Sequence, residues 1–225
     1  MAALYVLAAP EVASSAGLTQ ADAHTTDLTE GWRNRVREAA FRATETLRAA
    51  ASTEADTRVR EDIDILLRAA DNVVRGIEVH DAHVVRLIDV ARIAFGGLRV
   101  LLDEQNPPER KQLALARLRS YAGLDANTPL ARAAEAETRA RLGVAGLTQP
   151  YVQEVRTSLA LRPILIDGIG ELFWAAGLEG WQDAFDAFRE QAEAYAHFVE
   201  TEVLPRARTD HRLPPDVYSF ALHNV

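Results

Sequence analysis

The stretch WQDAFDAFREQAEAYAHFVETEVLPRARTDHRLPPDVYSFALHNV, residues 181–225, joins an amphipathic segment to a proline-rich turn and the start of another helix. Apolar side chains recur in its first half at alternating steps of four and three residues: Trp181, Phe185, Phe188, Ala192, Tyr195, Val199 and Val203. This spacing forms one stripe on a helix, and such a stripe packs against other helices. Pro205 ends the pattern, while Pro214 or Pro215 suits the first turn of a last helix.

The same rhythm, with the usual start and stop signals, predicts helices along the rest of the chain. The first runs from a capping-box-like start at Asp27 and Glu30 to about residue 51. Further helices are expected at about 54–77, 82–103, 108–121, 129–142 and 150–176. Gly76 to Asp81 is the expected joint between two of them, and Pro163 is expected to interrupt or bend another.

No segment alternates between apolar and polar residues at period two, so no sheet is expected. The sequence therefore predicts an all-α fold, a multi-helix array or bundle of about seven to nine helices. We expect residues 1–225 to form a single helical region, with a possible subdivision into 1–105 and 106–225.

Composition excludes several classes of protein. The net charge of -8 argues against nucleic-acid binding, which requires a basic face. The apolar run 84–102 carries Arg86, Asp89, Arg92 and Arg99, so we expect a buried soluble helix rather than a membrane span. Without a basic segment before its apolar start, the chain is expected to be cytoplasmic. The absence of cysteine rules out disulfides and zinc–thiolate sites.

Two clusters of polar residues are candidate sites. Imidazoles such as His80 and His83 can hold a metal ion, but no HExxH or ExxH motif supports them, and a solvated helix end is the favoured interpretation. His211 and Arg212 lie in the proline-rich turn, where a binding role competes with simple capping and ion pairing. The chain carries no Walker loop, no GxGxxG and no complete catalytic set.

Four segments together resemble a known family. They are EVLPRARTDHRLPPDVY at 202–218, PPER at 107–110, LARL at 115–118 and LTQPYVQEV at 147–155. In their order along the chain, with 202–218 last, and at these intervals they resemble the amino-terminal half of the bacterial domain-of-unknown-function family 885. The resemblance extends from about Leu4 to Val225.

This resemblance implies that the chain is the helical, non-catalytic half of a zinc-dependent, metallopeptidase-like hydrolase with a zincin-like fold. The family's HExxH helix would lie in a carboxy-terminal half or a second chain, so zinc is expected in the parent or complex and not in this chain alone. The present chain would form one wall of a cleft for a peptide or amide-type substrate. There, Arg212 would hold a carboxylate, Tyr218 would donate to a developing oxyanion, and His211 would lie nearby.

A second hypothesis is a stand-alone helical interaction module without catalytic activity. The first hypothesis predicts a large bare apolar patch where the catalytic half docks, whereas the second predicts little exposed apolar surface. A homo-oligomer is compatible with either hypothesis.

Overall fold

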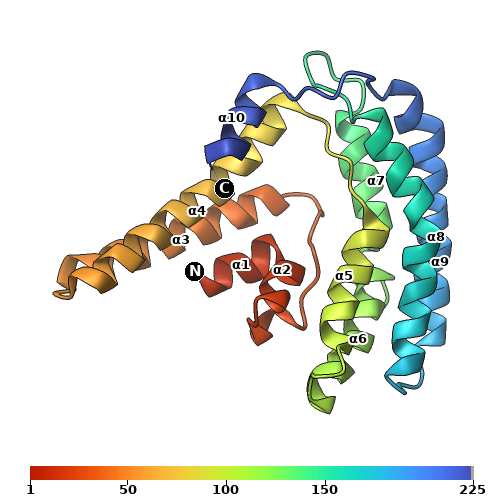
Figure 1. Cartoon of the computed structure of the whole chain (residues 1–225), viewed down its shortest axis with the longest axis horizontal. Coiled ribbons are helices and arrows are strands. Elements are labelled where there is room, and N and C mark those ends of the chain that lie inside the picture. The colour runs from red at the N-terminus through yellow and green to blue at the C-terminus, as the bar shows by residue number, and fades with distance from the viewer. Residues whose placement is uncertain (224–225) are drawn as a thin grey trace.

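The computed structural model of the protein describes residues 1–223 and confirms the predicted all-α fold (Figure 1). The described residues contain no strand, only two isolated bridges. Their α-helices are α1 (Ala2–Ala8), α2 (Pro10–Ser15), α3 (Trp32–Thr53), α4 (Thr57–His83), α5 (Val90–Leu102), α6 (Pro108–Tyr121), α7 (Leu130–Arg141), α8 (Val152–Ala175), α9 (Gln182–Phe198) and α10 (Pro215–His223). None of these helices is both long enough and apolar enough to cross a bilayer.

The helices form two bodies that lie side by side (Figure 1). Helices α3 and α4 make an antiparallel pair, the hairpin arm, which projects away from the rest. Helices α5 to α9 make the bundle. The N-terminal helices α1 and α2 lie between the two bodies, and α10 returns from the bundle to pack on α4.

The larger apolar core lies inside the bundle. Leu98, Leu118, Phe173 and Phe188 of four different helices are completely buried there. The stripe predicted on α9 is confirmed, because its members from Phe188 onward are buried and Trp181 and Phe185 pack partly buried against the same core. The stripe continues beyond α9 through a π-helical turn, Val199–Val203.

A second, smaller core joins α1 to the hairpin arm. Its buried members are Leu4, Trp32, Val36, Ala39, Ala40 and Ala70. Leu28 packs against both cores. Because the two cores are otherwise separate, polar contacts carry much of the connection between arm and bundle.

The predicted joint at Gly76 to Asp81 is wrong, because α4 continues through it to His83. The chain instead becomes extended at 84–89, where a helix was expected. There the Val85 N–H donates to Thr148 O (2.9 Å), and the Thr148 N–H donates to His83 O (2.8 Å). Asp89 then caps α5 by accepting from the Arg92 N–H at 3.0 Å.

Two further expectations concern helix starts and bends. The capping box at Asp27 and Glu30 is wrong: α3 begins at Trp32, after Gly31 in the left-handed region (φ 78°). Asp27 accepts from the Thr29 N–H at 2.9 Å instead. Helix α8 runs without a break through Pro163, so the proline does not interrupt it. Pro108 and Pro215 start α6 and α10, as predicted.

Candidate functional site at the junction of arm and bundle

The residues singled out from the sequence gather where α10 meets the end of α4. Val217 is buried at 4% exposure, and the ring of Phe220 lies edge-on to His80, with ring centroids 6.3 Å apart. The His83 Nε2 atom lies 3.1 Å from Asp216 Oδ2. The two histidines of the last turns of α4 therefore hold α10 in place.

The weak metal candidates His80 and His83 are already engaged by protein groups. The Nδ1 atom of His80 lies 2.6 Å from Gly76 O, within its own helix. In the described part of the chain, no group of three or more His, Cys, Asp or Glu side chains is placed to hold a metal ion. The donor set at α4 and α10 does not fit a zinc site, because His80, His83 and Asp216 do not converge on one point where a metal ion could be held.

The predicted substrate-binding residues lie on the loop before α10 and on α10 itself. The His211 ring faces Tyr151 of the bundle, with centroids 6.4 Å apart. Arg212 is exposed, and its backbone N–H donates to Asp210 Oδ1 at 3.0 Å. Tyr218 is 56% exposed on α10. Within the described residues, no hydrogen bond, ion pair or ring contact joins these three side chains to one another.

The loop before α10 is fixed to the bundle by its backbone. The Val152 N–H donates to Arg208 O (2.9 Å), and the Arg208 N–H donates to Pro150 O (2.9 Å). The Arg208 guanidinium also donates from Nε to Gln149 O at 2.9 Å. Thr148 pairs with Val84 in the segment between α4 and α5, and Tyr151 pairs with Arg208 in the loop before α10. Residues 148–152 therefore contact both segments by which the chain passes between the arm and the bundle.

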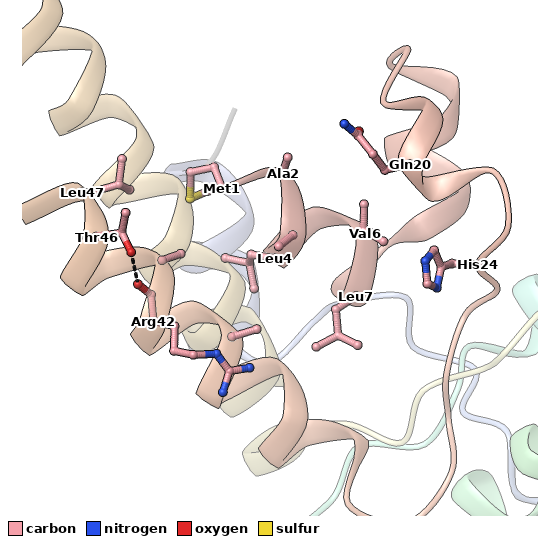
Figure 2. A pocket seen from close by; sticks show the side chains of 13 residues that line it. Met1, Ala2, Leu4, Val6, Leu7, Gln20, His24, Arg42, Thr46 and Leu47 are labelled. Carbon is pink, nitrogen blue, oxygen red and sulfur yellow. Dashed lines mark hydrogen bonds between the residues drawn. The ribbon is translucent and has the colours of Figure 1, made fainter. Parts of the chain in front are cut away.

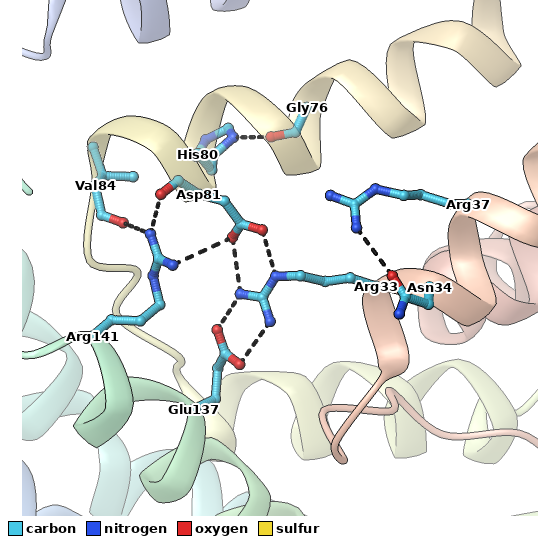
Figure 3. Close-up of polar contacts among 9 residues, drawn as sticks. All are labelled: Arg33, Asn34, Arg37, Gly76, His80, Asp81, Val84, Glu137 and Arg141. Atoms are coloured by element: carbon cyan, nitrogen blue, oxygen red, sulfur yellow. Dashed lines mark hydrogen bonds and ion pairs between the residues drawn. The ribbon is translucent and has the colours of Figure 1, made fainter.

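A network of charged side chains, the Arg33 network, joins arm and bundle below these crossings (Figure 3). Arg33 of α3 donates to both carboxylate oxygens of Asp81, from Nε at 2.5 Å and from Nη2 at 2.9 Å. It also donates to both oxygens of Glu137 on α7, from Nη1 at 2.9 Å and from Nη2. Arg141 donates to the backbone oxygens of Asp81 and Val84. Two bidentate pairs on one guanidinium give this contact both strength and a fixed geometry.

Electrostatics in this network favour the charged forms of Arg33 and Glu137. The hydrogen bond to Glu137 is the main cause that raises the pKa of Arg33, although burial opposes the shift. Burial alone would raise the pKa of Glu137, but its hydrogen bonds and ion pair with Arg33 outweigh burial and lower it. The side chains of Arg33, Asp81 and Glu137 are 20%, 22% and 14% exposed, so solvent screens this network only partly.

A second polar group fixes the N-terminal helices to the bundle. Asp22 is 1% exposed and accepts from Arg110 Nε at 2.7 Å. Glu11 of α2 accepts from the hydroxyl of Tyr121 at 2.7 Å. The guanidinium of Arg117, which is fully buried, donates to Gly97 O and Ala21 O at 2.9 and 2.6 Å. Burial raises the pKa of Tyr121, and the neighbouring carboxylate of Glu11 adds to the shift.

Sequence reasoning missed both polar groups. Arg33 is 48 residues from Asp81 and 104 from Glu137 in the chain, so no local spacing connects them. The one available signal was the position of Arg33, directly after Trp32 at the start of an apolar helix face. Comparisons of the chain with protein-family models, with curated proteins and with solved structures found no match.

Proposed function

We propose that the protein is the helical, non-catalytic half of a zinc-dependent, metallopeptidase-like hydrolase, and that a catalytic polypeptide docks on α10. The zinc and the hydrolase activity in this proposal come from the resemblance of residues 107–110, 115–118, 147–155 and 202–218 to the family described above. The docking site comes from α10, which begins inside the longest of those segments, 202–218, and continues past its end to His223.

The bare apolar face of α10 is the observation that carries the proposal. One face of α10 is anchored, since Val217 is buried and Phe220 contacts α4. On other sides Tyr218 and Leu222 are 56% and 57% exposed, and they follow each other at a spacing of four residues. Leu213, just before the helix, is 43% exposed. Asp216 and Ser219 of α10 are exposed as well, so the apolar surface is confined to the side that carries Tyr218 and Leu222, and that side is where we expect a partner.

Zinc, in this proposal, belongs to the partner. The imidazoles of His80 and His83 are engaged by Gly76 and α10, and the described residues offer no third ligand. The role left to this chain is to hold a substrate against the partner. Arg212 offers a guanidinium for a carboxylate from an exposed position before α10, and Tyr218, which belongs to the docking face, offers its hydroxyl for an oxyanion at the edge of that face.

The test uses the gene that encodes the chain. The reading frame that follows codon 225, or an adjacent frame, should encode an HExxH helix within the next few hundred residues. The purified chain should contain no stoichiometric zinc and should not cleave a library of peptides. Its mixture with the downstream polypeptide should contain zinc and should cleave peptides. One tightly bound zinc per purified chain, or peptidase activity of the chain alone, would overturn the proposal.

A second candidate function is a stand-alone helical interaction module, and the distribution of the other apolar side chains favours it. Phe41, Ile164 and Trp174 are 66%, 67% and 81% exposed, but they lie on different helices or on different faces of one helix. Single exposed side chains of this kind are normal on a self-sufficient surface. Light scattering separates the candidates: a partner-free module should stay monodisperse at high concentration, whereas a bare docking face should self-associate.

A further inference from the structure

A groove separates α1 from α3 on the side of the arm that faces the N-terminal helices (Figure 2). Its volume is about 720 Å³, within the range of small-molecule sites. Met1, Leu4, Val6 and Leu7 line one wall, and α3 supplies the other. No residue of α10 lines it, so it is distinct from the docking face proposed above.

Small side chains keep this groove open. Leu4 is 1% exposed and anchors α1 in the core of the arm, yet Ala39 and Ala43 face the groove from α3. Ala2 and Ala3 line it from α1. Larger side chains at these positions would fill the space between the two helices and extend the apolar core.

The charges at the groove are of one sign. Arg42 and His24 are the side chains lining it that can carry a charge, and both are positive when charged. No acidic side chain lines it, although the whole chain has a net charge of -8. The nearest counter-charge known for Arg42 is Glu38, at a long 3.8 Å on the exposed side of α3. An exposed pair of this kind is weak and leaves Arg42 available to a ligand.

Polar groups lie on both sides of the groove, among the apolar ones: Thr46 and Arg42 on α3, and Gln20 and His24 on the other side. Figure 2 shows Met1 and Leu47 at one end and His24 with Gln20 at the other. The Arg42 side chain extends from α3 toward the side on which Leu7 and His24 are drawn. An apolar trough with cationic groups at its rim matches a molecule with an apolar tail and an anionic head.

We propose that this groove binds a single-chain carboxylate amphiphile, of the fatty-acid class. The acyl chain would lie along Leu4 and Leu47, and the carboxylate would meet the guanidinium of Arg42. The charge of the rim specifies the anionic head, and the alanines specify a slender chain rather than a bulky ring system. A docked peptide would need partners for its backbone groups, and the groove offers few.

The test is a calorimetric titration of the full chain with dodecanoate, kept below its micellar concentration. We expect saturable binding of one molecule per chain. The neutral glycerol ester of the same acid should bind about fivefold more weakly, because it lacks the charge-assisted hydrogen bond to Arg42. Arg42→Gln should weaken dodecanoate binding by about the same factor and leave the neutral ester unaffected.

The chain offers matched controls for both features of the groove. Arg48→Gln is the control for Arg42→Gln, because both arginines lie on α3 and their side chains are similarly exposed, at 67% and 70%. Each also pairs with a glutamate three or four residues earlier, Glu45 for Arg48 and Glu38 for Arg42. Arg48→Gln should leave binding unchanged. Ala43→Phe should abolish binding by filling the groove, whereas Ala49→Phe, on the exposed side of α3, should not.

Three results would overturn the proposal. The first is an absence of saturable binding below the micellar concentration. The second is an equal effect of Arg42→Gln and Arg48→Gln. The third is wild-type affinity in a folded Ala43→Phe variant. If Ala43→Phe fails to fold, judged by circular dichroism, the comparison of the two arginine variants decides alone.

Discussion

At the residue scale, Arg33 is the side chain that contributes most to holding the arm in its position against the bundle. Its guanidinium spans from Asp81 of the arm to Glu137 of the bundle, and it also lies over the Trp32 ring at 4.5 Å. Removing one of the two carboxylates around a partly buried cation destabilises the fold, because the remaining ion pair no longer offsets the free energy of desolvating the guanidinium.

Glu137→Gln should therefore destabilise the protein by about 2 kcal/mol, since it removes the charge of one partner and one of two charge-assisted hydrogen bonds. Urea unfolding measures the change. Glu135→Gln is the control on the same helix, because Glu135 pairs with Arg139 at an exposed site and should contribute less than about 0.5 kcal/mol. Equal effects of the two variants would refute the structural role given to Arg33.

The lowered pKa of Glu137 also predicts a dependence of stability on pH. A carboxylate whose pKa falls on folding stabilises the folded state fully above its ordinary value of 4.5 and loses that contribution as the pH falls below it. The free energy of unfolding of the wild type should thus decline more steeply below pH 4.5 than that of Glu137→Gln. The free energy of unfolding is measured with urea at several pH values. If it falls with pH in parallel in the two proteins, Glu137 does not cause the loss of stability at low pH.

At the element scale, regular helices could be predicted and their tertiary connections could not. The α9 stripe, Pro108 and Pro215 are local signals, because periodicity and proline stereochemistry act within one or two turns. Gly143 follows the C-cap of α7 with φ 78°, a left-handed backbone conformation that favours glycine.

The errors have causes outside the local sequence. Gly76 does not break α4, and a Cβ there would lie 3.2 Å from Phe220 Cζ, so the glycine serves the close approach of α10. Residues 84–89 are apolar enough for a helix, but the backbone of Thr148 pairs with His83 and Val85, where α4 ends. Of the candidate site, the start of the last helix could be predicted, whereas the Arg33 network depends on contacts between residues 48 and 104 positions apart.

Phe220→Ala should release α10 from α4 without unfolding the arm, because α10 contacts the rest of the described structure mainly through α4. Hydrogen exchange of the α10 amides should become faster, while that of α3 and α4 should stay within error. Tyr218→Ala is the matched control and should leave α10 protected, since Tyr218 is exposed in this chain. Unchanged exchange in Phe220→Ala would show that other contacts hold the helix.

At the scale of the whole molecule, two apolar cores are joined largely through polar groups. The bundle core holds residues of α5 to α9, the smaller core holds α1, α3 and α4, and Leu28 packs against both. Polar connections of this kind resemble interfaces between domains, which permit relative motion more readily than a shared apolar core does.

The double variant Asp81→Asn/Glu137→Gln should consequently broaden the distribution of arm positions. Spin labels at Ser52, near the tip of the arm, and at Glu179, in the loop after α8, would report the distance by pulsed electron resonance. The distribution should be wider in the double variant than in the wild type. The exposed variant Glu45→Gln should match the wild type, and a narrow distribution in all three would mean that the Arg33 network does not set the geometry.

The most direct measurement of the central claim is the affinity of the chain for the catalytic polypeptide that we propose docks on α10. Tyr218→Ser/Leu222→Ser removes two exposed apolar side chains from α10 and should weaken that affinity by at least about a hundredfold, as loss of a central apolar anchor does. Ile164→Ser/Trp174→Ser removes two still more exposed apolar side chains from α8 and should leave the affinity unchanged. Equal affinities for all three proteins, or no complex with the wild type, would contradict the account.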